Sequence, residues 1–163
     1  MDLISPISDN LSELLLKVLQ FTASRRSTLY RNIRKMRAPG FLPQDMPVLE
    51  FAHAMNGAIA EHLLNERLLF RDTENIEFGE NGTMHLSSVP DTYAEALLAA
   101  NSDEYLEHQI DKLLENSLNR RVAENLLRLK SEVLSPSSPS HAGEMQTGKD
   151  PRKDPSASCE SEE

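Results

Sequence analysis

Apolar residues recur with the period of an α-helix near both ends of the chain. Close to the N-terminus the recurring positions are three and four residues apart, the spacing of a helix face that packs lengthwise on a partner. These positions are Leu15, Leu19, Thr22, Arg26, Leu29, Ile33 and Met36. Ser8 and Asn10 can cap the first turn, and the residue before Pro39 is disfavoured in a helix. We therefore expect an N-terminal helix over 9–38, preceded by a short extension over 1–8.

A second helical pattern fills 101–134, where neither proline nor glycine occurs. Asp103 and Glu104 lie at its start and Arg128 and Lys130 near its end, as the helix dipole favours. We expect the two helices to pack lengthwise as a coiled-coil-like pair. The predicted packing residues are Leu15, Leu19, Leu29 and Ile33 on the first helix and Ile110, Leu114, Leu118 and Leu126 on the second.

The segment between the two helices, 39–100, has mixed patterns. Residues 47–70 are helical in pattern but weakened at Asn56-Gly57, and 91–100 predict a short helix. Apolar residues alternate on both sides of Asn81-Gly82 within 76–86, which predicts a short β-hairpin. The predicted fold class is therefore all-α, with two long terminal helices and a small, variable middle segment.

The last part of the chain differs in composition from the rest. From Ser135 onward serine, proline and acidic residues dominate, and Met145 is the only large apolar residue. Such a segment buries too little apolar surface to offset its chain entropy, so we expect a disordered tail over 135–163. The net charge of the chain is −9, and the tail, with three basic and six acidic residues, contributes −3 of it. The remaining −6 makes the body a poor overall match for a polyanion.

Several classes of site lack their usual residues. The single cysteine, Cys159, lies in the tail, so no disulfide can form within the chain. No apolar run is long enough for a transmembrane helix, and the N-terminus lacks the features of a cleaved secretory signal. With no tryptophan, an aromatic-lined pocket for a small-molecule substrate is not expected.

One pair of residues has the spacing of a metal-binding helix. Glu50 and His53 stand three residues apart, as in di-iron helical proteins, but the second such pair that those proteins need is missing. A solvated helix face is the better interpretation. The chain also lacks the usual nucleophile, zinc-protease and phosphate-binding motifs. We therefore expect no metal, no cofactor and no enzymatic activity.

A cationic run without carboxylates lies at the end of the first helix. It comprises Arg25, Arg26, Arg31, Arg34, Lys35 and Arg37. One interpretation is that these side chains extend beside apolar positions and pair with Glu104, Glu107, Asp111 and Glu115. The other is a local nucleic-acid-binding patch, with strongly salt-dependent affinity. We favour the first interpretation.

Two stretches together resemble the flagellar basal-body rod proteins, specifically the small proximal-rod B subunit. In that family an N-terminal helix runs into a pattern like N-I-A-N-x-x-T-P-G-Y, followed by an aspartate. Here "RRSTLYRNIRKMRAPGFLPQD" supplies Asn32, Ile33, Pro39, Gly40, Phe41 and Asp45 at matching places. The C-terminal helix is similar to that of the family at Asn101, Asp103, Leu106, Glu107, Gln109, Asn116, Leu118 and Leu126. Arg34, Lys35, Arg37 and Ala38 depart from the family pattern, and the tail is additional.

The resemblance implies a structural subunit of the flagellar rod. Its partners would be other rod subunits, copies of itself and the export apparatus, and its place the basal body, reached without a cleaved signal. The terminal helices would become ordered as they assemble. Two alternatives stay open: a cytoplasmic helical adaptor or chaperone of the export apparatus, and a nucleic-acid-binding helical protein that uses 25–37.

Overall fold

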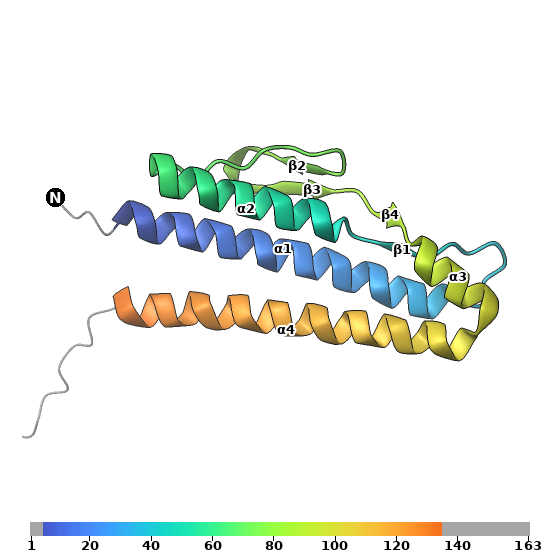
Figure 1. Cartoon of the computed structure of the whole chain (residues 1–163). Helices are drawn as coiled ribbons and strands as arrows, with labels where there is room; N and C mark the ends of the chain where they lie inside the picture. The colour runs from blue at the N-terminus through green and yellow to red at the C-terminus, as the bar shows by residue number, and fades with distance from the viewer. Residues whose placement is uncertain (1–4, 135–163) are drawn as a thin grey trace, which may run out of the picture.

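Two long antiparallel helices form the body of the molecule (Figure 1). The structure, a computed structural model, describes residues 5–134. Helix α1 spans Ser5–Lys35 and helix α4 spans Ser102–Leu134, and the two contact each other lengthwise. The start of α1 and the end of α4 lie at the same end of the molecule. The prediction of a mostly helical fold with two long terminal helices is confirmed.

The first helix begins earlier than the capping residues predicted. Ser8 and Asn10 lie inside α1, and Asn10 Nδ2 lies 3.3 Å from His62 Nδ1 instead of capping the helix. The predicted extension, 1–8, is thus helical from Ser5, and its first four residues lie outside the described part. At the other end, the helix stops at Lys35 and a turn follows. Gly40 has a φ of +68°, a conformation that glycine adopts without steric cost, so the chain reverses where Pro39-Gly40 predicted a break.

The last helix starts where its sequence indicated. The Asn101 side-chain oxygen accepts a hydrogen bond of 3.0 Å from the Asp103 backbone N–H, which is the contact of an N-cap residue. The predicted tail, 135–163, with Cys159 and Met145, lies outside the described residues.

The middle segment folds back along α1. It contains α2 (Val48–Asn65), β2 (Ile76–Phe78), β3 (Met84–Leu86) and α3 (Thr92–Ala100). Strands β2 and β3 pair antiparallel, so the predicted hairpin is confirmed. Its turn, Glu80–Gly82, places Asn81 and Gly82 at positive φ. Two further strands were not predicted: β1 (Gln44–Asp45) pairs antiparallel with β4 (Val89–Pro90).

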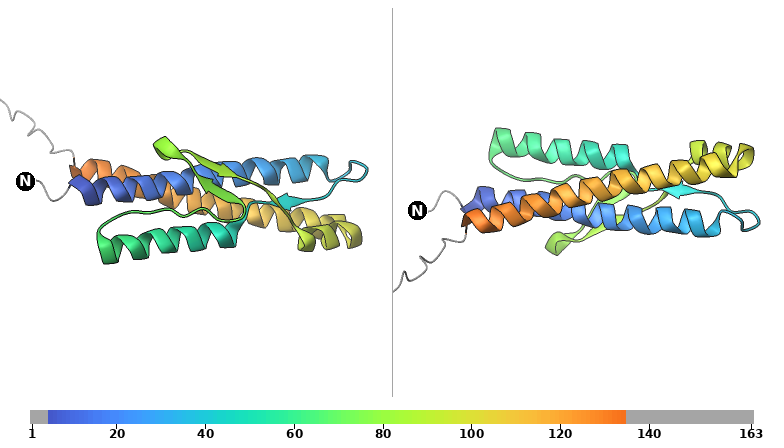
Figure 2. Two further views of the ribbon diagram at one scale, coloured as in Figure 1. Left: turned by 90° about the horizontal axis from the view of Figure 1, so that it is seen from above. Right: turned by 90° about the horizontal axis from the view of Figure 1, so that it is seen from below.

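The apolar core lies between α1, α2 and the hairpin. The rings of Phe21 on α1 and Phe51 on α2 stack with centroids 4.1 Å apart. Around them lie Met46, Ala54, Met55 and Ile76. In the two views of Figure 2, α2 lies along one side of the α1–α4 pair and the hairpin crosses over α1. The core therefore anchors α1 to the middle segment, whereas α4 meets α1 outside this core.

No helix within residues 5–134 combines the length and the continuous apolar character that crossing a bilayer requires.

Candidate assembly interface

The face of α4 that packs on α1 is largely polar. We call it the inner face of α4, and it consists of Tyr105, Gln109, Lys112, Asn116 and Ala123. Four of these residues are fully or almost fully buried, and the Lys112 side chain is only 16% exposed. Their spacing of three, four and seven residues places them on one side of the helix. The contact between the terminal helices is therefore not a row of leucines.

The residues predicted to make that contact from α4 lie instead on its outside. Ile110 is 45% exposed, Leu114 59%, Leu118 62% and Leu126 44%. The prediction that they pack on α1 is wrong for Ile110, Leu114 and Leu118, whereas Leu126, although exposed, lines a groove along α1 together with Leu15. The reason is that the polar inner face and these residues occupy different sides of the same helix, and the polar side faces α1.

These residues belong to a longer apolar surface, which we call the outer ridge of α4. It consists of Ile110, Leu114, Leu118, Val122, Leu126, Leu129 and Val133, each between 44% and 83% exposed. Successive members are mostly four residues apart, and such a spacing forms one of the natural ridges on a helix surface. A continuous apolar ridge of this length on an exposed helix is typical of a surface that binds another protein.

On α1 the predicted packing residues are more buried than those on α4. Leu15 is 5% exposed and Leu29 is completely buried, as expected, while Leu19 and Ile33 are half-buried. Arg26, which the repeat placed within the packing face, is exposed, and its guanidinium lies over the Tyr30 ring. Its neighbour in sequence, Arg25, is the buried one.

Arg25 is the centre of a buried ion cluster that joins three parts of the chain. Its Nε and Nη2 donate to the Asp45 carboxylate at 3.0 and 3.2 Å, and Nη1 donates to Glu115 at 3.2 Å. Lys112 Nζ donates to Asp45 at 3.0 Å and also to Asp91. The cluster thus ties α1 and α4 to the two ends of the middle segment, at β1 and just before α3.

The charges of this cluster stabilise one another. Burial alone would raise the pKa of Asp45, but the hydrogen bonds and positive charges of Arg25 and Lys112 hold it below its ordinary value. Burial likewise opposes the charge of Arg25, yet Asp45 and Glu115 raise its pKa. Both groups therefore stay ionised inside the fold. Removing Asp45 would leave Arg25 with only the exposed Glu115 and Lys112 with only Asp91, so the buried charges would be poorly compensated.

Two asparagines complete the contact behind the outer ridge. Asn32 Nδ2 donates to the Gln44 carbonyl oxygen at 2.6 Å and to Gln109 Oε1 at 3.0 Å. Asn116 Nδ2 donates to the Thr22 carbonyl oxygen at 2.8 Å. Both asparagines are buried, so these bonds fix the register of the helix pair.

The residues that carry the family resemblance differ in their burial. Asn32, Asp45 and Asn116 are buried and make the polar contacts above. Pro39 and Gly40 are exposed at the turn, Phe41 is half-buried beside them, and Leu118 lies on the outer ridge. The structure therefore brings Asn32, Asp45, Gln109 and Asn116 together on the inner side of the helix pair, and it leaves Leu118 exposed, together with Asn101, Asp103 and Glu107.

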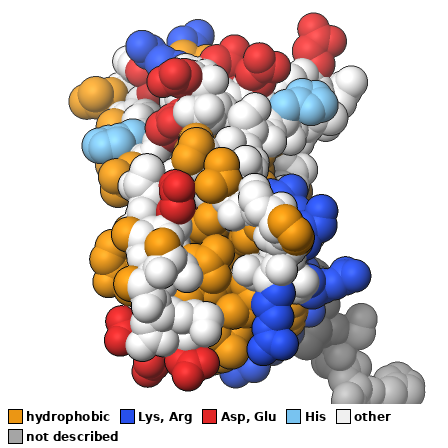
Figure 3. All heavy atoms as spheres, turned by 90° about the vertical axis from the view of Figure 1, so that its right-hand side faces the viewer, with side chains coloured by type: hydrophobic (Ala, Val, Ile, Leu, Met, Phe, Trp, Pro, Cys, Tyr) orange, Lys and Arg blue, Asp and Glu red, His pale blue; other side chains and the backbone are white. Residues whose placement is uncertain are grey.

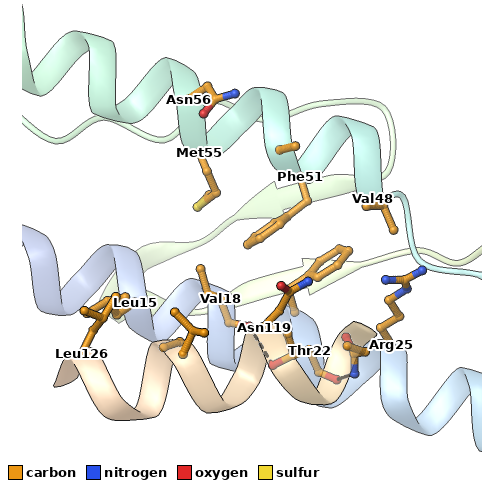
Figure 4. Close-up of a pocket in the computed structure, with 15 residues that line it drawn as sticks. Leu15, Val18, Thr22, Arg25, Val48, Phe51, Met55, Asn56, Asn119 and Leu126 are labelled. Atoms are coloured by element: carbon orange, nitrogen blue, oxygen red, sulfur yellow. Dashed lines mark hydrogen bonds between the residues drawn. The ribbon is translucent and has the colours of Figure 1, made fainter. Parts of the chain in front are cut away.

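An apolar groove lies beside the outer ridge. It has a volume of about 400 Å³ and runs along α1 between α2 and α4. Figure 4 shows Phe51 and Met55 pointing from α2 into it, with Val18 below them on α1. Val122 and Leu126 of the outer ridge line the opposite wall. Ridge and groove therefore form one connected apolar surface.

The cationic run of α1 is mostly unpaired. Among the described residues, Arg25 alone of the six cations lies in an ion pair; the others, Arg26, Arg31, Arg34, Lys35 and Arg37, are exposed. The favoured prediction that the run pairs with Glu104, Glu107, Asp111 and Glu115 holds only for the bond between Arg25 and Glu115. The other cations are exposed around α1, where Arg26 lies over the Tyr30 ring and Arg31 donates to Gln44 at 3.4 Å.

The Glu50–His53 pair has a structural explanation. The Glu50 carboxylate accepts hydrogen bonds from the Thr73 hydroxyl at 2.7 Å and from the Asn75 side chain at 2.7 Å. These bonds lower its pKa and fasten the segment before β2 to α2. Within residues 5–134, no three His, Cys, Asp or Glu side chains are grouped so that they could hold a metal ion.

No family model, curated protein or solved structure matches this chain.

Sequence patterns alone missed the ion cluster. Arg25, Asp45, Asp91 and Lys112 are far apart in the sequence, and the strand pair that brings two of them together is only two residues long. One signal was available: Lys112 and the buried amides Gln109 and Asn116 share a helix face with Tyr105. A polar residue set at helical spacing indicates a face with its own partner, even when a larger apolar face is present.

Proposed function

We propose that this chain is a structural subunit of the bacterial flagellar basal-body rod and works by helix packing rather than by catalysis. The observation that carries the proposal is the outer ridge of α4, whose seven apolar side chains are 44–83% exposed. Burying such a ridge against a neighbouring helix supplies about 25 cal/mol for each Å² of apolar surface. The proposal also rests on the resemblance of 10–45 and 101–134 to the rod family.

The inner face supports a role in assembly for a second reason. The ion cluster and the two asparagines hold α1 and α4 together without using the apolar residues of the outer ridge. The ridge and the connected groove are thus left to other proteins. In a rod subunit these partners would be further subunits, including copies of the same chain, placed in the basal body after export.

The proposal can be tested by fractionation. We would extract basal bodies from the source cells with detergent and measure by mass spectrometry whether the chain copurifies with them. We expect that it does, and that Leu118→Glu on the outer ridge abolishes copurification. The matched control is Leu63→Glu on α2, because Leu63 is 78% exposed but lies outside the ridge. The control should copurify like the parent chain.

Retention of the parent chain in the soluble fraction would overturn the rod proposal and favour an adaptor or chaperone of the export apparatus.

The helicity of the purified chain separates the same alternatives. In α4 beyond Asn116, Ala123 is buried and Lys130 Nζ donates to Ser12 Oγ on α1, but the ridge residues are exposed. Much of the apolar surface of this half is therefore unpacked in a monomer. A rod subunit should gain helicity there as protein concentration rises, and an adaptor should not.

A further inference from the structure

The exposed sides of α1 and α4 carry opposite charges over the same length of the helix pair. On α1 the unpaired cations lie between Arg26 and Arg37, and no carboxylate occurs in that stretch. On α4 the exposed acidic residues Glu104, Glu107 and Asp111 lie in no ion pair among the described residues, whereas Glu115, at the end of the same stretch, already pairs with Arg25. The only Lys or Arg of that stretch, Lys112, is turned inward to Asp45 and Asp91. We call these surfaces the basic face of α1 and the acidic face of α4.

The two faces run side by side because the helices are antiparallel. Thr22 lies opposite Asn116, and Asn32 lies opposite Gln109, as their hydrogen bonds show. Residues 26–37 of α1 therefore run alongside residues 104–115 of α4. Within one chain, however, the faces cannot meet. Thr22, Arg25 and Asn32 take up the side of α1 toward α4. The other cations are exposed around the rest of the helix surface, where Arg31 donates to Gln44 at 3.4 Å.

Each face also has apolar side chains among its charges. Tyr30 is 46% exposed next to the guanidinium of Arg26, and it lines a hollow with Arg31 and Arg34. On α4, Ile110 and Leu114 are exposed beside Glu107 and Asp111. Apolar side chains surrounded by charges form a typical protein–protein contact, in which the charges select the partner and its register. Figure 3 shows Lys and Arg side chains gathering along one edge of this end of the molecule.

We infer that the partner of the basic face of α1 is the acidic face of α4 in a second copy of this chain. The inference rests on the proposed function, because it names the neighbour in the assembly. Consider a second copy that is shifted sideways without rotation. Its α4 then runs antiparallel to α1 of the first copy, as the first copy's own α4 does. Its residues 104–115 then lie opposite residues 26–37 without any change of register. After two copies pair, one of them still has an unused basic face and the other an unused acidic face. Further copies can therefore add by the same contact, which builds an array instead of a closed dimer.

The test uses two double variants of the full chain that remove charge from one face each. Arg31→Gln with Arg34→Gln neutralises the basic face, and Glu107→Gln with Asp111→Asn neutralises the acidic face. All four side chains are exposed, so the fold should be kept, which circular dichroism would check. We would measure self-association by sedimentation at low and high sodium chloride concentrations.

We expect the parent chain to associate at low salt and its association constant to fall roughly tenfold or more at high salt. Each double variant alone should associate at least as weakly as the parent at high salt. An equal mixture of the two should form one-to-one pairs that grow no further, because each pair has only one intact basic face and one intact acidic face in contact.

Association of both variants like the parent chain would overturn the inference. So would binding of a single-stranded thymidine oligonucleotide that is lost in the basic-face variant while self-association is unchanged, since the basic face would then serve a polyanion. The outcome is separable from the proposed function. Charge-dependent association of a chain that does not copurify with basal bodies refutes the rod proposal alone. Copurification of both double variants at the parent level refutes only the charge pairing.

Discussion

The two sides of α4 are built in opposite ways. The inner face is buried and rich in polar groups, several of which have specific partners: Gln109 Oε1 and Asn116 Nδ2 are bonded to α1, and Lys112 is bonded to two aspartates. Among the described residues, the Tyr105 hydroxyl and Gln109 Nε2 are buried without a hydrogen-bond partner. The outer ridge is apolar and exposed over its whole length. In a protein that works alone the reverse arrangement would be expected. The difference indicates that polar contacts determine how α4 packs within this chain, whereas the apolar outer ridge is available to bind a partner.

Polar contacts suit the inner face because they specify one arrangement. A row of leucines can slide by a turn at little cost, but Asn32 and Asn116 find their partners in a single register. The ion cluster adds the middle segment to the same arrangement, because Asp45 and Asp91 come from its two ends. The outer ridge then keeps its apolar surface in a fixed geometry for a neighbour.

The largest expected effect comes from breaking the ion cluster. Asp45→Asn keeps the shape of the side chain but leaves Arg25 and Lys112 without the carboxylate that they share, and both are buried or nearly so. Removing one partner of a buried ion pair costs about 3–5 kcal/mol of the free energy of unfolding. Urea unfolding followed by circular dichroism measures this loss.

The matched control is Glu115→Gln, which removes the other acceptor of Arg25. The Glu115 side chain is 57% exposed, so its loss should cost at most about 1 kcal/mol. If both substitutions had the same small effect, the inner face would not depend on its buried charges, and the contrast with the outer ridge would lose its basis.

Acid should remove the contribution of the same carboxylate gradually. The pKa of Asp45 is lowered in the folded chain by Arg25 and Lys112, acting against burial. A group with a lowered folded pKa stabilises the fold above its unfolded pKa, about 3.9 for aspartate, and this stabilisation is lost as the pH falls through the folded pKa.

The difference in unfolding free energy between the parent chain and Asp45→Asn should therefore be constant near neutral pH. It should shrink below a pH of about 4. Urea titrations at a series of pH values measure it. A difference that stays the same in acid would mean that the two cations do not act through the ionised carboxylate.

Hydrophobic periodicity was sufficient to predict the helices but not their faces. The repeats located α1 and α4 because helical spacing persists whether the partner is internal or external. The β2–β3 hairpin was predictable because Asn81-Gly82 tolerates the positive φ that its turn requires. The expectation that apolar side chains are buried led to the wrong position for Ile110 and Leu118. It does not specify whether the same chain or another molecule buries them.

The ion cluster could not have been predicted in the same way. Arg25 and Arg26 are adjacent in sequence and identical in chemistry, and a shift of one residue rotates the side chain by about 100° around the helix. The seven-residue repeat selected Arg26, whereas the fold buries Arg25. Only the position of Asp45, set by the short pairing of β1 with β4, decides between the two.

The smallest expected effect on folding comes from the outer ridge. Leu118→Gln should change the free energy of unfolding of the isolated chain by no more than about 0.5 kcal/mol, because the side chain is 62% exposed and glutamine is a good helix former. Leu29→Ala is the matched internal control. Leu29 is completely buried, so its truncation should cost about 2–5 kcal/mol. Urea unfolding at a concentration where the chain is monomeric compares the two.

The order of the two variants should reverse when association between copies is measured instead of the stability of the monomer. Leu118→Gln should weaken the association of copies strongly although it hardly affects the monomer, because the polar amide would be buried against the neighbour. Leu29→Ala should weaken association only as far as it unfolds the chain. If Leu118→Gln destabilised the monomer as much as Leu29→Ala, the outer ridge would be part of the internal packing. The apolar surface of α4 would then have no role left in binding a neighbour.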